Sequence, residues 1–511
     1  MDGNAGNVTL CRYPGTREVK LQREVQPPPG GIPSAGKEPS RGSITHATLW
    51  TLGGEAASYG IRFISSIILT RLLAPEVFGL MAVVQVFMQG LIMFSDLGVR
   101  PIIIRHERGD DPAFLNTIWT VRLIRGSVLA VVLGALAWPV ATFYGQPVLA
   151  LILPAASLNL LLEGLLSTKI YSQERHLARA RLTVITVASS IAGIIFMIAW
   201  AWKFRSVWAL VWGGIFAVLV RVVLSYVALP GPGNRFHWDR AAWAEVASFG
   251  KWIFLNSVVT FLAMQVDKLL FAKLVPLALL GIYGLAINII QLPTMAVRAV
   301  ASSVTFPAFS RIRNAKGDLA AVYDRMRLPL LLLGGGALSF LIFNGPWLVA
   351  VMYDPRYEAA GWILQVSAFG GWFVILEAAP GLMLLALGDP RWQTVASGAK
   401  ILAMAAVVPL AFLTFKEEYR FPAALAGISL VEAVRYVIVN QRIRRAGLTG
   451  RNYELSMTLL MLAFGGAAVA IQHGPWLAGG PVLRGAVSFA VFTAVWLPIG
   501  LWYLRKWRKP A

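Results

Sequence analysis

Hydrophobic residues gather in this chain into long runs that short polar stretches separate. A helix needs about 20 apolar residues to cross a hydrocarbon core about 30 Å thick, and runs of that order recur through most of the sequence. The pattern predicts an all-α integral membrane protein with about 14 transmembrane helices. The expected spans are 47–70, 76–98, 117–143, 147–168, 182–202, 207–229, 248–272, 278–300, 328–351, 358–387, 392–414, 420–440, 454–472 and 483–504.

Two of the predicted turns repeat each other. Arg71 and Gly79 in the first turn correspond to Lys273 and Gly281 in the second, 202 residues later in both cases. A proline also stands in each turn. Related bundles that face each other are common in secondary transporters, so we predict two pseudo-symmetric six-helix lobes. The expected division is a tail at 1–43, a first lobe at 44–243, a second lobe at 244–445, and two additional helices with a basic end at 446–511.

Composition agrees with this class, and the positions of the charges add a topology. The chain is 57% hydrophobic and 14% charged, whereas soluble domains are about 25% charged. A net charge of +21 would suggest nucleic-acid binding in a soluble protein. Here Lys and Arg concentrate in the N-terminal tail, in alternate connections and at the C-terminus. This distribution follows the positive-inside rule, so we predict that both termini are cytoplasmic and that no nucleic acid is bound.

Several kinds of chemistry have no residues to support them. The one cysteine, Cys11, allows no disulfide within the chain, and the five histidines fall at predicted helix ends or in loops. We therefore expect no metal site and no cofactor. The sequence has no Walker loop, no Rossmann glycine fingerprint and no HExxH motif, so we do not expect an enzyme. The tail at 1–43 is rich in Pro, Gly and charge and is expected to be disordered and cytoplasmic.

The first predicted span carries a polar stripe. Glu55, Ser58, Tyr59, Arg62 and Ser66 are spaced i, i+3, i+4, i+7 and i+11, so they share one helix face. An ionisable residue inside a span marks a buried pair or a transport pathway. In the first case the stripe fixes packing against other helices. In the second it lines an aqueous cavity, where Arg62 offers a planar donor fork to phosphate oxygens and Glu55 exchanges a proton or holds a cation.

The first helix of the second lobe repeats the theme. Asn256, Thr260 and Asp267 are spaced i, i+4 and i+11, with Lys268 beside them. Asp267 and Lys268 lie nearer the outer end of the span, so a local ion pair and side chains that extend to the surface are the alternatives to a functional role. Glu377 is central in its own span, where it either functions in ion coupling or bonds within the bundle.

Three further polar residues are candidates for a cavity. Arg221 lies about two helical turns from the inner end of its span. Asn288 and Gln291 could hydrogen-bond sugar hydroxyls, although polar contacts between helices are the alternative.

Other charges receive a structural interpretation. Arg122 and Arg125 lie near the start of the third span, so we interpret them as side chains that extend to the inner surface. Glu432 and Arg435 are three residues apart on one helix and are interpreted as a local pair. Asp96 is interpreted as part of a helix terminus.

Two stretches carry a family resemblance. The run from Leu69 to Arg105 contains TRLLAPEVFGLMAV, then SDLGV and an arginine, and it resembles the polysaccharide-transport family of bacterial flippases. The run from Gln265 to Asn288, QVDKLLFAKLVPLALLGIYGLAIN, resembles that family's second hallmark, in which an acidic residue precedes a short turn and a Gly-x-Tyr. The likeness extends over about 47–440, and the two additional C-terminal helices also occur in relatives.

The resemblance implies two six-helix lobes around a central cavity that opens alternately to each side, as in the superfamily of MATE exporters and the lipid II flippase. Such proteins move undecaprenyl-diphosphate-linked oligosaccharide repeat units across the bacterial inner membrane for O-antigen, capsule or exopolysaccharide assembly. It implies membrane lipids, a polysaccharide polymerase and chain-length or export proteins as partners. It also implies H⁺ or Na⁺ coupling, for which Glu55, Asp267 and Glu377 are the candidates. Arg62 is the nearest positional match to an arginine that contributes to the lipid II site.

Two rival classes remain open. A MATE-like exporter of cationic drugs should have an acidic cavity, against which Arg62 and Arg221 argue. A membrane polymerase or ligase needs acidic or histidine groups at the outer face. Outside the spans the tight acidic pairs are Asp110–Asp111, which is expected to begin the third helix, and Glu417–Glu418 in a short outer loop. The charged first helix argues against a scaffold that transports nothing.

Overall fold

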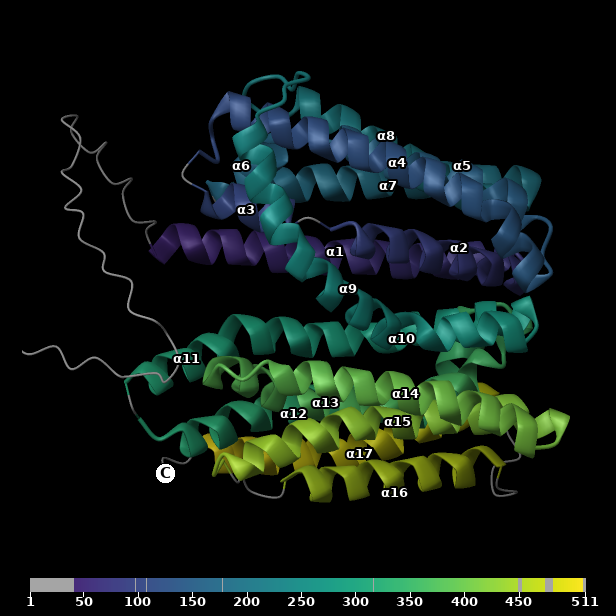
Figure 1. Cartoon of the computed structure of the whole chain (residues 1–511). Helices are drawn as coiled ribbons and strands as arrows, with labels where there is room; N and C mark the ends of the chain where they lie inside the picture. The colour runs from purple at the N-terminus through teal and green to yellow at the C-terminus, as the bar shows by residue number, and fades with distance from the viewer. Residues whose placement is uncertain are drawn as a thin grey trace, which may run out of the picture.

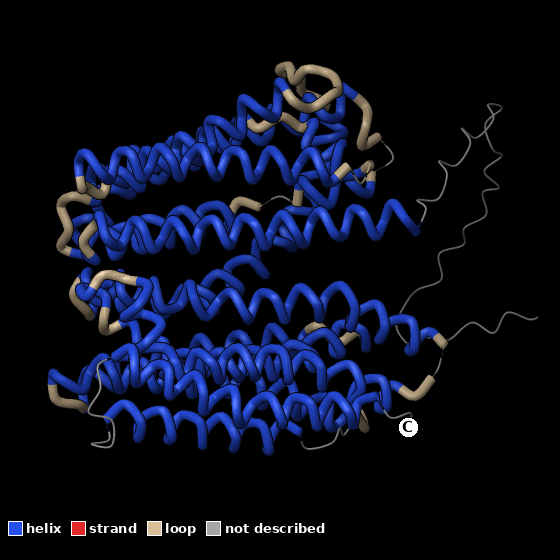
Figure 2. The backbone as a smooth tube through the Cα atoms, turned by 180° about the vertical axis from the view of Figure 1, so that it is seen from behind, coloured by secondary structure: helices blue, strands red, loops and turns tan. Residues whose placement is uncertain are grey.

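The computed structural model of the chain describes residues 41–508, apart from 97, 107, 177, 316, 449–452 and 474–480. Those residues form helices joined by short connections, and no strand occurs among them. The long helices run side by side in two bundles (Figure 1), and the view from behind shows the same two bundles (Figure 2). The all-α class predicted from the hydrophobic runs is confirmed.

The first bundle is drawn from purple to blue-teal in the upper part of Figure 1. Within it α1 packs mainly against α7, α4 against α5, and α7 against α8. Its helices are α1 (Arg41–Leu72), α2 (Pro75–Phe94), the short α3 (Val99–Arg105), α4 (Pro112–Tyr144), α5 (Leu149–Leu165), the short α6 (Lys169–Arg175), α7 (Arg179–Phe204) and α8 (Trp208–Val227).

The second bundle begins with α9, which crosses from the first bundle to the second (Figure 1). The predicted lobe boundary at 243/244 falls inside this helix. The last two helices pack against α12. The elements are α9 (Arg240–Leu274), α10 (Leu277–Val300), the π-helical η1 (Ala301–Thr305), α11 (Phe306–Asn314), α12 (Leu319–Met352), the 3₁₀ turn η2 (Pro355–Tyr357), α13 (Ala360–Leu387), α14 (Arg391–Thr414), α15 (Glu417–Arg445), α16 (Tyr453–His473) and α17 (Pro481–Arg508).

Not every long helix meets the length and hydropathy expected of a membrane span. A long helix lies at each of the predicted ranges. Among the residues described, ten helices are long and apolar enough to cross a membrane, and the pair α5 and α6, bent by 55°, adds an eleventh. The polar helices α1 and α9 are not among them. The chain is a multi-pass membrane protein, and the count of about 14 stays a prediction.

The connections contain more helix than their polar composition indicated. The long connection expected at 301–327 is mostly helical, because α10 continues through the π-helical turn into α11. The short helices α3 and α6 occupy two other predicted loops. Hydropathy measures whether a segment suits the hydrocarbon core and does not distinguish a polar helix from a loop. These segments are therefore short helices that the hydropathy pattern did not distinguish from loops.

The acidic pair before Pro112 begins the third long helix, as predicted. Asp111 is the N-cap of α4 and accepts a hydrogen bond from the Ala113 amide at 3.1 Å. Pro112 follows at the first helical position, where a missing amide hydrogen has no consequence. A hydrogen bond from Arg108 lowers the pKa of Asp111 below its usual value. This carboxylate therefore has a capping role, and its surroundings are those of a helix terminus.

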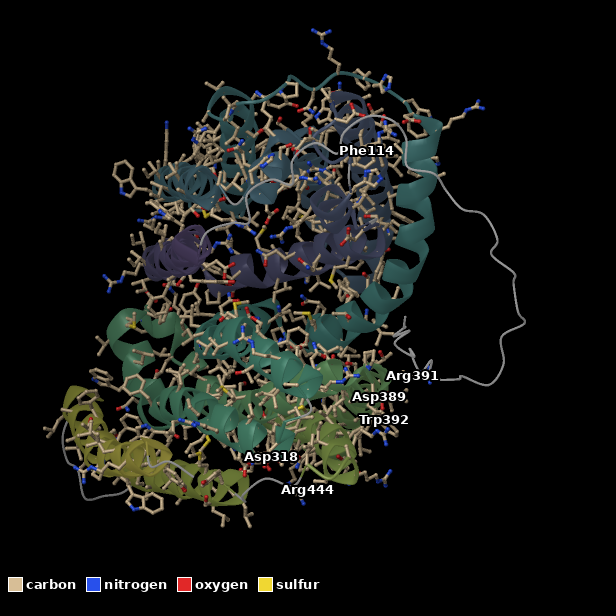
Figure 3. All side chains as sticks on the ribbon, turned by 90° about the vertical axis from the view of Figure 1, so that its left-hand side faces the viewer. Phe114, Asp318, Asp389, Arg391, Trp392 and Arg444 are labelled. Carbon is tan, nitrogen blue, oxygen red and sulfur yellow. The ribbon has the colours of Figure 1, made fainter. Side chains whose placement is uncertain are left out.

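The two ends of the molecule differ. We call the end with the α1–α2 and α9–α10 turns the hairpin end, and the end with α3, α6 and α11 the α11 end. Figure 3 views the molecule from the α11 end and labels Asp389, Arg391 and Trp392 around the start of α14. Asp389 accepts from Arg442 at 3.0 Å, and the Arg442 guanidinium lies 5.7 Å from the centre of the Trp392 ring. The α13–α14 turn is thus tied to the end of α15.

Candidate functional site

A cavity of about 910 Å³ lies between the bundles and extends into the first one. We call it the central cavity. Its wall comes from all eight helices of the first bundle and from α9 and α10. Its charged lining residues are the cations Arg62, Arg100, Arg122, Arg125 and Lys268 and the carboxylates Asp96 and Glu163. Five cations against two carboxylates give the lining a net charge of +3.

Two of these cations face the cavity from opposite bundles. Arg62 is on α1 and exposed to the cavity, and Lys268 is on α9 and half-buried. Within the described part of the chain, neither side chain has a hydrogen-bond or ion-pair partner. Their charges are therefore available to an anionic ligand that touches both bundles.

Arg122 and Arg125 are held by helix C-termini. Arg122 is 9% exposed and donates to the carbonyl oxygens of Glu163 at 2.6 Å and Leu166 at 3.2 Å, at the end of α5. Arg125 donates to the Ile92 carbonyl at 2.7 Å and the Ser95 hydroxyl at 2.9 Å, at the end of α2. The partial negative charge of a helix C-terminus favours a cation there. The interpretation that these side chains extend to the inner surface is wrong, since both turn to carbonyls beside the cavity.

Arg100 on α3 belongs to a tighter cluster. It donates from Nε to Glu174 on α6 at 2.9 Å, and Arg179 on α7 contacts the same carboxylate at 2.6 Å. Glu174 is 6% exposed. The hydrogen bond to Glu174 raises the pKa of Arg100 in spite of partial desolvation, so the guanidinium stays charged. The cluster ties α3, α6 and α7 together beside the cavity.

Uncharged polar groups complete the lining. Gln85, Asn159, Ser190 and Asn288 come from α2, α5, α7 and α10. Amides and hydroxyls both donate and accept hydrogen bonds, which suits a ligand rich in hydroxyl groups. Asn288 was a candidate from the sequence, and the structure places it in this wall.

The other candidates for substrate contact are placed differently. Tyr59 is half-buried on α1 and Gln291 half-buried on α10, and neither lines the cavity. Arg221 on α8 is also outside the lining, but it contacts the lining carboxylate Glu163 at 3.5 Å. The side chain of Asn256 lies outside the described part of the chain.

The candidates for ion coupling do not meet in one place. Glu55 is exposed on α1 and lies outside the cavity lining. Asp267 is 9% exposed and accepts a hydrogen bond of 2.5 Å from the hydroxyl of Tyr283. These two residues are the acidic residue and the tyrosine of the second hallmark stretch, and they join α9 to α10 next to Lys268.

Glu377 belongs to a buried network in the second bundle. It is 6% exposed on α13 and accepts from Arg435 of α15 at 3.2 Å. One turn earlier on α15, Glu432 pairs with Lys400 of α14 at 2.6 Å. The predicted local pair of Glu432 and Arg435 is therefore wrong. Their spacing places both on one face of α15, but that face packs against α13 and α14, which supply the opposite charges.

The bundles touch at the hairpin end through two glycines. A Cβ atom added to Gly79 of α2 would lie 2.0 Å from the carbonyl oxygen of Leu277 on α10. A Cβ added to Gly281 of α10 would lie 2.1 Å from the carbonyl oxygen of Pro75 on α2. Pro75 and Leu277 are also 202 residues apart, so the contact obeys the pseudo-symmetry of the repeat. Gly281 also lines the cavity, so this glycine contact lies at the cavity wall.

Hydrogen bonds to main-chain carbonyls add to the contact between the bundles at this end. Tyr357 of η2 donates to the Leu73 carbonyl at the end of α1 at 2.9 Å. Arg356 donates to the carbonyl of Thr70 at 3.4 Å and is itself held by Asp354 at 2.8 Å. On the other side Lys273 donates to a carbonyl of the α4 end and lies 4.8 Å from the ring centre of Phe143. The α1–α2 hairpin therefore contacts η2 of the second bundle, and the α9–α10 hairpin contacts the end of α4 in the first.

Comparisons with known proteins agree with this architecture. Residues 68–360 match the model of the family described as polysaccharide biosynthesis protein. The chain is 24% identical over 303 residues to the amylovoran biosynthesis protein AmsL of Erwinia amylovora, which covers 57% of this chain and 77% of AmsL. It is 21% identical over 391 residues to the lipopolysaccharide biosynthesis protein WzxC of Escherichia coli K12, which covers 75% of each.

Among solved structures, the lipid II flippase MurJ in an inward closed conformation superposes with a TM-score of 0.67 at 12% identity. The superposition covers 88% of this chain and 99% of MurJ, so the fold is shared although the sequences have diverged. Because the family model matches more than half of the chain, this protein belongs to the polysaccharide biosynthesis protein family.

Proposed function

We propose that this protein is a flippase that translocates undecaprenyl-diphosphate-linked oligosaccharide repeat units across the bacterial inner membrane. The observation that carries the proposal is the cationic central cavity. Arg62 lines it from the first bundle and Lys268 from the second, and neither has a hydrogen-bond or ion-pair partner among the described residues. Family membership and the names of AmsL and WzxC support a role in polysaccharide biosynthesis. MurJ, which has the same fold, is a lipid II flippase, and this supports the same kind of transport here.

The chemistry of such a substrate explains why a protein cavity is needed. A diphosphate and several sugars cross hydrocarbon at a large cost in free energy, because charges and hydroxyls lose their hydration there. Arginine and lysine replace that hydration with charge-assisted hydrogen bonds to phosphate oxygens. Asn288, Asn159, Gln85 and Ser190 would bind the sugar hydroxyls, while the polyprenyl chain stays in the bilayer.

Transport by alternating access requires the hairpin end to open. We assign this end to the outer face and both termini to the cytoplasm, because the α11 end carries most of the basic connections. The substrate would enter a cavity closed by the contact of Gly79 and Gly281 and leave when that contact separates. Glu55, Asp267 and Glu377 remain the candidates for H⁺ or Na⁺ coupling, and a polysaccharide polymerase and export proteins would receive the product.

Replacing Arg62 with alanine is expected to trap full-length repeat units in the inner leaflet. A hydrogen bond to a charged group contributes about 1.5–3 kcal/mol, and about 1.4 kcal/mol is a factor of ten. Flipping should therefore slow by about tenfold or more. The measurement is leaflet-resolved tracing of lipid-linked intermediates in a strain that lacks the gene, complemented with wild type, Arg62→Ala or Arg62→Lys.

Arg391→Ala is the matched control, because this arginine is exposed at the α11 end and does not line the cavity. Lysine at position 62 should retain part of the rate, since it keeps the charge and loses the fork geometry. If single repeat units reached the outer leaflet in the deletion strain and stayed unpolymerised there, flipping would be intact. The protein would then act as a polymerase or ligase instead.

A further inference from the structure

The positive charge around the central cavity exceeds what a diphosphate neutralises. The carboxylates Asp96 and Glu163 line it, and Glu174 contacts the lining residue Arg100. Seven cations line it or contact those carboxylates: Arg62, Arg100, Arg122, Arg125, Arg179, Arg221 and Lys268. Seven cations against three carboxylates leave four positive charges in excess. Each phosphodiester phosphate carries one negative charge, so a diphosphate diester removes about two of them.

The excess is concentrated at Arg122 and Arg125. Arg122 is more than nine-tenths buried, and its hydrogen-bond acceptors are the neutral carbonyl oxygens of Glu163 and Leu166. The acceptors of Arg125 are a carbonyl and a hydroxyl. A guanidinium has five N–H donors, and these contacts use two from each arginine. Both arginines therefore keep a full charge and further donors beside the cavity.

Among the described residues, no carboxylate forms an ion pair with Arg122 or Arg125. The Glu163 side chain contacts Arg221 at 3.5 Å, while Arg122 uses only its main-chain oxygen. Asp96 is exposed and accepts the Gly98 amide at 2.9 Å. Arg122 rests on the C-terminus of α5 and lies 5.2 Å from the centre of the Tyr171 ring. A helix end and an aromatic face supply only partial negative charge. A ligand carboxylate would supply the missing full charge.

The two arginines are held in place before any ligand arrives. They are three residues apart on α4 and share a face. The backbone of α4 touches that of α5 at two glycines, where a Cβ on Gly126 would lie 2.6 Å from the Leu160 carbonyl and one on Gly164 would lie 2.8 Å from the Arg122 carbonyl. This close approach places Arg122 directly at the C-terminus of α5. The site is therefore built into the packing of the first bundle.

We propose, on the basis of the flippase function above, that the repeat unit carried by this protein is acidic, and that Arg122 and Arg125 bind a sugar carboxylate such as that of a uronic acid. Arg62 and Lys268 are left for the diphosphate, because they face the cavity from both bundles. A neutral repeat unit would leave two positive charges of the cavity wall without an opposite charge, and one of them, Arg122, is more than nine-tenths buried, which is unfavourable. The charge of the cavity thus selects the class of sugar.

The test compares two synthetic ligands on the purified full-length protein in nanodiscs. Both are polyprenyl diphosphates bearing the same trisaccharide, which ends in glucuronate in one and in glucose in the other. Microscale thermophoresis at low and high salt should show about tenfold tighter binding of the acidic ligand at low salt and a smaller difference at high salt. In Arg125→Gln, and in Arg122→Gln/Arg125→Gln, the preference for the acidic ligand should fall to about twofold or less.

The outcomes separate this inference from the proposed function. Equal affinity of wild type for the two ligands, with both lost in Arg62→Ala, would overturn the acidic substrate and leave the flippase in place. Failure of both ligands to bind wild type would contradict the flippase itself. If Arg122→Gln prevents folding, the comparison of wild type with Arg125→Gln still decides. Arg125 is half-buried, and among the described residues it forms no ion pair, so its replacement leaves no buried carboxylate without a partner. Arg391→Gln serves as the control for the loss of a remote positive charge.

Discussion

Replacing Gly79 with leucine is expected to hold the hairpin end open and to slow transport by about tenfold or more. The added Cβ would stand 2.0 Å from the carbonyl oxygen of Leu277, far inside van der Waals contact. Because the obstacle is backbone, α2 and α10 must move apart. Overpacking of this kind costs about 1–3 kcal/mol, which the closed state bears and the open state does not. The population of the closed state falls accordingly.

The measurement is the distance between spin labels at Val148 and Glu358, which lie on the α4–α5 and α12–α13 connections of opposite bundles. The labels go into a chain whose one cysteine, Cys11, is replaced by serine. Gly79→Leu should shift the distance distribution to longer values, and Gly281→Leu should do the same by the pseudo-symmetry. Leucine is a better helix former than glycine, so a weakened α2 cannot be the cause.

Gly134→Leu is the matched control in α4, because no atom lies within 4 Å of a Cβ added there. It should leave both the distance distribution and the transport rate as in wild type. An unchanged distance distribution in Gly79→Leu, together with wild-type transport, would show that the glycine contact is not the closure of the cavity. In that case the hydrogen bonds that Tyr357 and Arg356 donate to carbonyls of α1 and its turn would be the next contacts to examine.

The amino-acid sequence predicted the architecture well because the determinants of the fold are local and periodic. Hydrophobic runs marked where long helices lie, and the 202-residue repeat marked the two hairpins that meet across the pseudo-symmetry axis. Arg62 and Asn288 were also identified, and both line the cavity. Polar residues inside apolar helices are rare enough to stand out without knowledge of the packing.

What the sequence did not predict depends on partners from distant parts of the chain. Arg122 and Arg125 looked like side chains near a helix end, because hydropathy reports depth and not the direction in which a side chain points. Their acceptors are carbonyls at the ends of α2 and α5, and a backbone carbonyl leaves no trace in a sequence pattern. For Lys268 the sequence left a functional role, a local ion pair and a side chain that extends to the surface as open alternatives for the same reason. The sequence shows that these arginines share a face of α4, but only the structure shows that this face packs against the ends of α2 and α5.

Replacing Arg435 with alanine is expected to destabilise the second bundle by about 3 kcal/mol. Arg435 contacts Glu377 at 3.2 Å, and Glu377 is 6% exposed. Removing one partner of a buried ion pair leaves the other charge without compensation, which costs more than the pair contributed. The measurement is thermal unfolding of the purified protein in detergent. A matched variant, Arg435→Lys, keeps the charge and should retain most of the stability.

The double variant Glu377→Met/Arg435→Met separates a structural from a coupling role for Glu377. Replacing a buried pair by apolar residues of similar volume is often close to neutral for stability, so this variant should unfold near the wild-type temperature. The neighbouring ion pair of Lys400 and Glu432 is left in place. Because Glu432 lies one turn from Arg435 on α15, the contributions of the two pairs to stability are not expected to add. Wild-type transport in the folded double variant would exclude Glu377 from ion coupling. Loss of transport with stability retained would show that transport needs the charges of Glu377 and Arg435 and not only the packing that they provide.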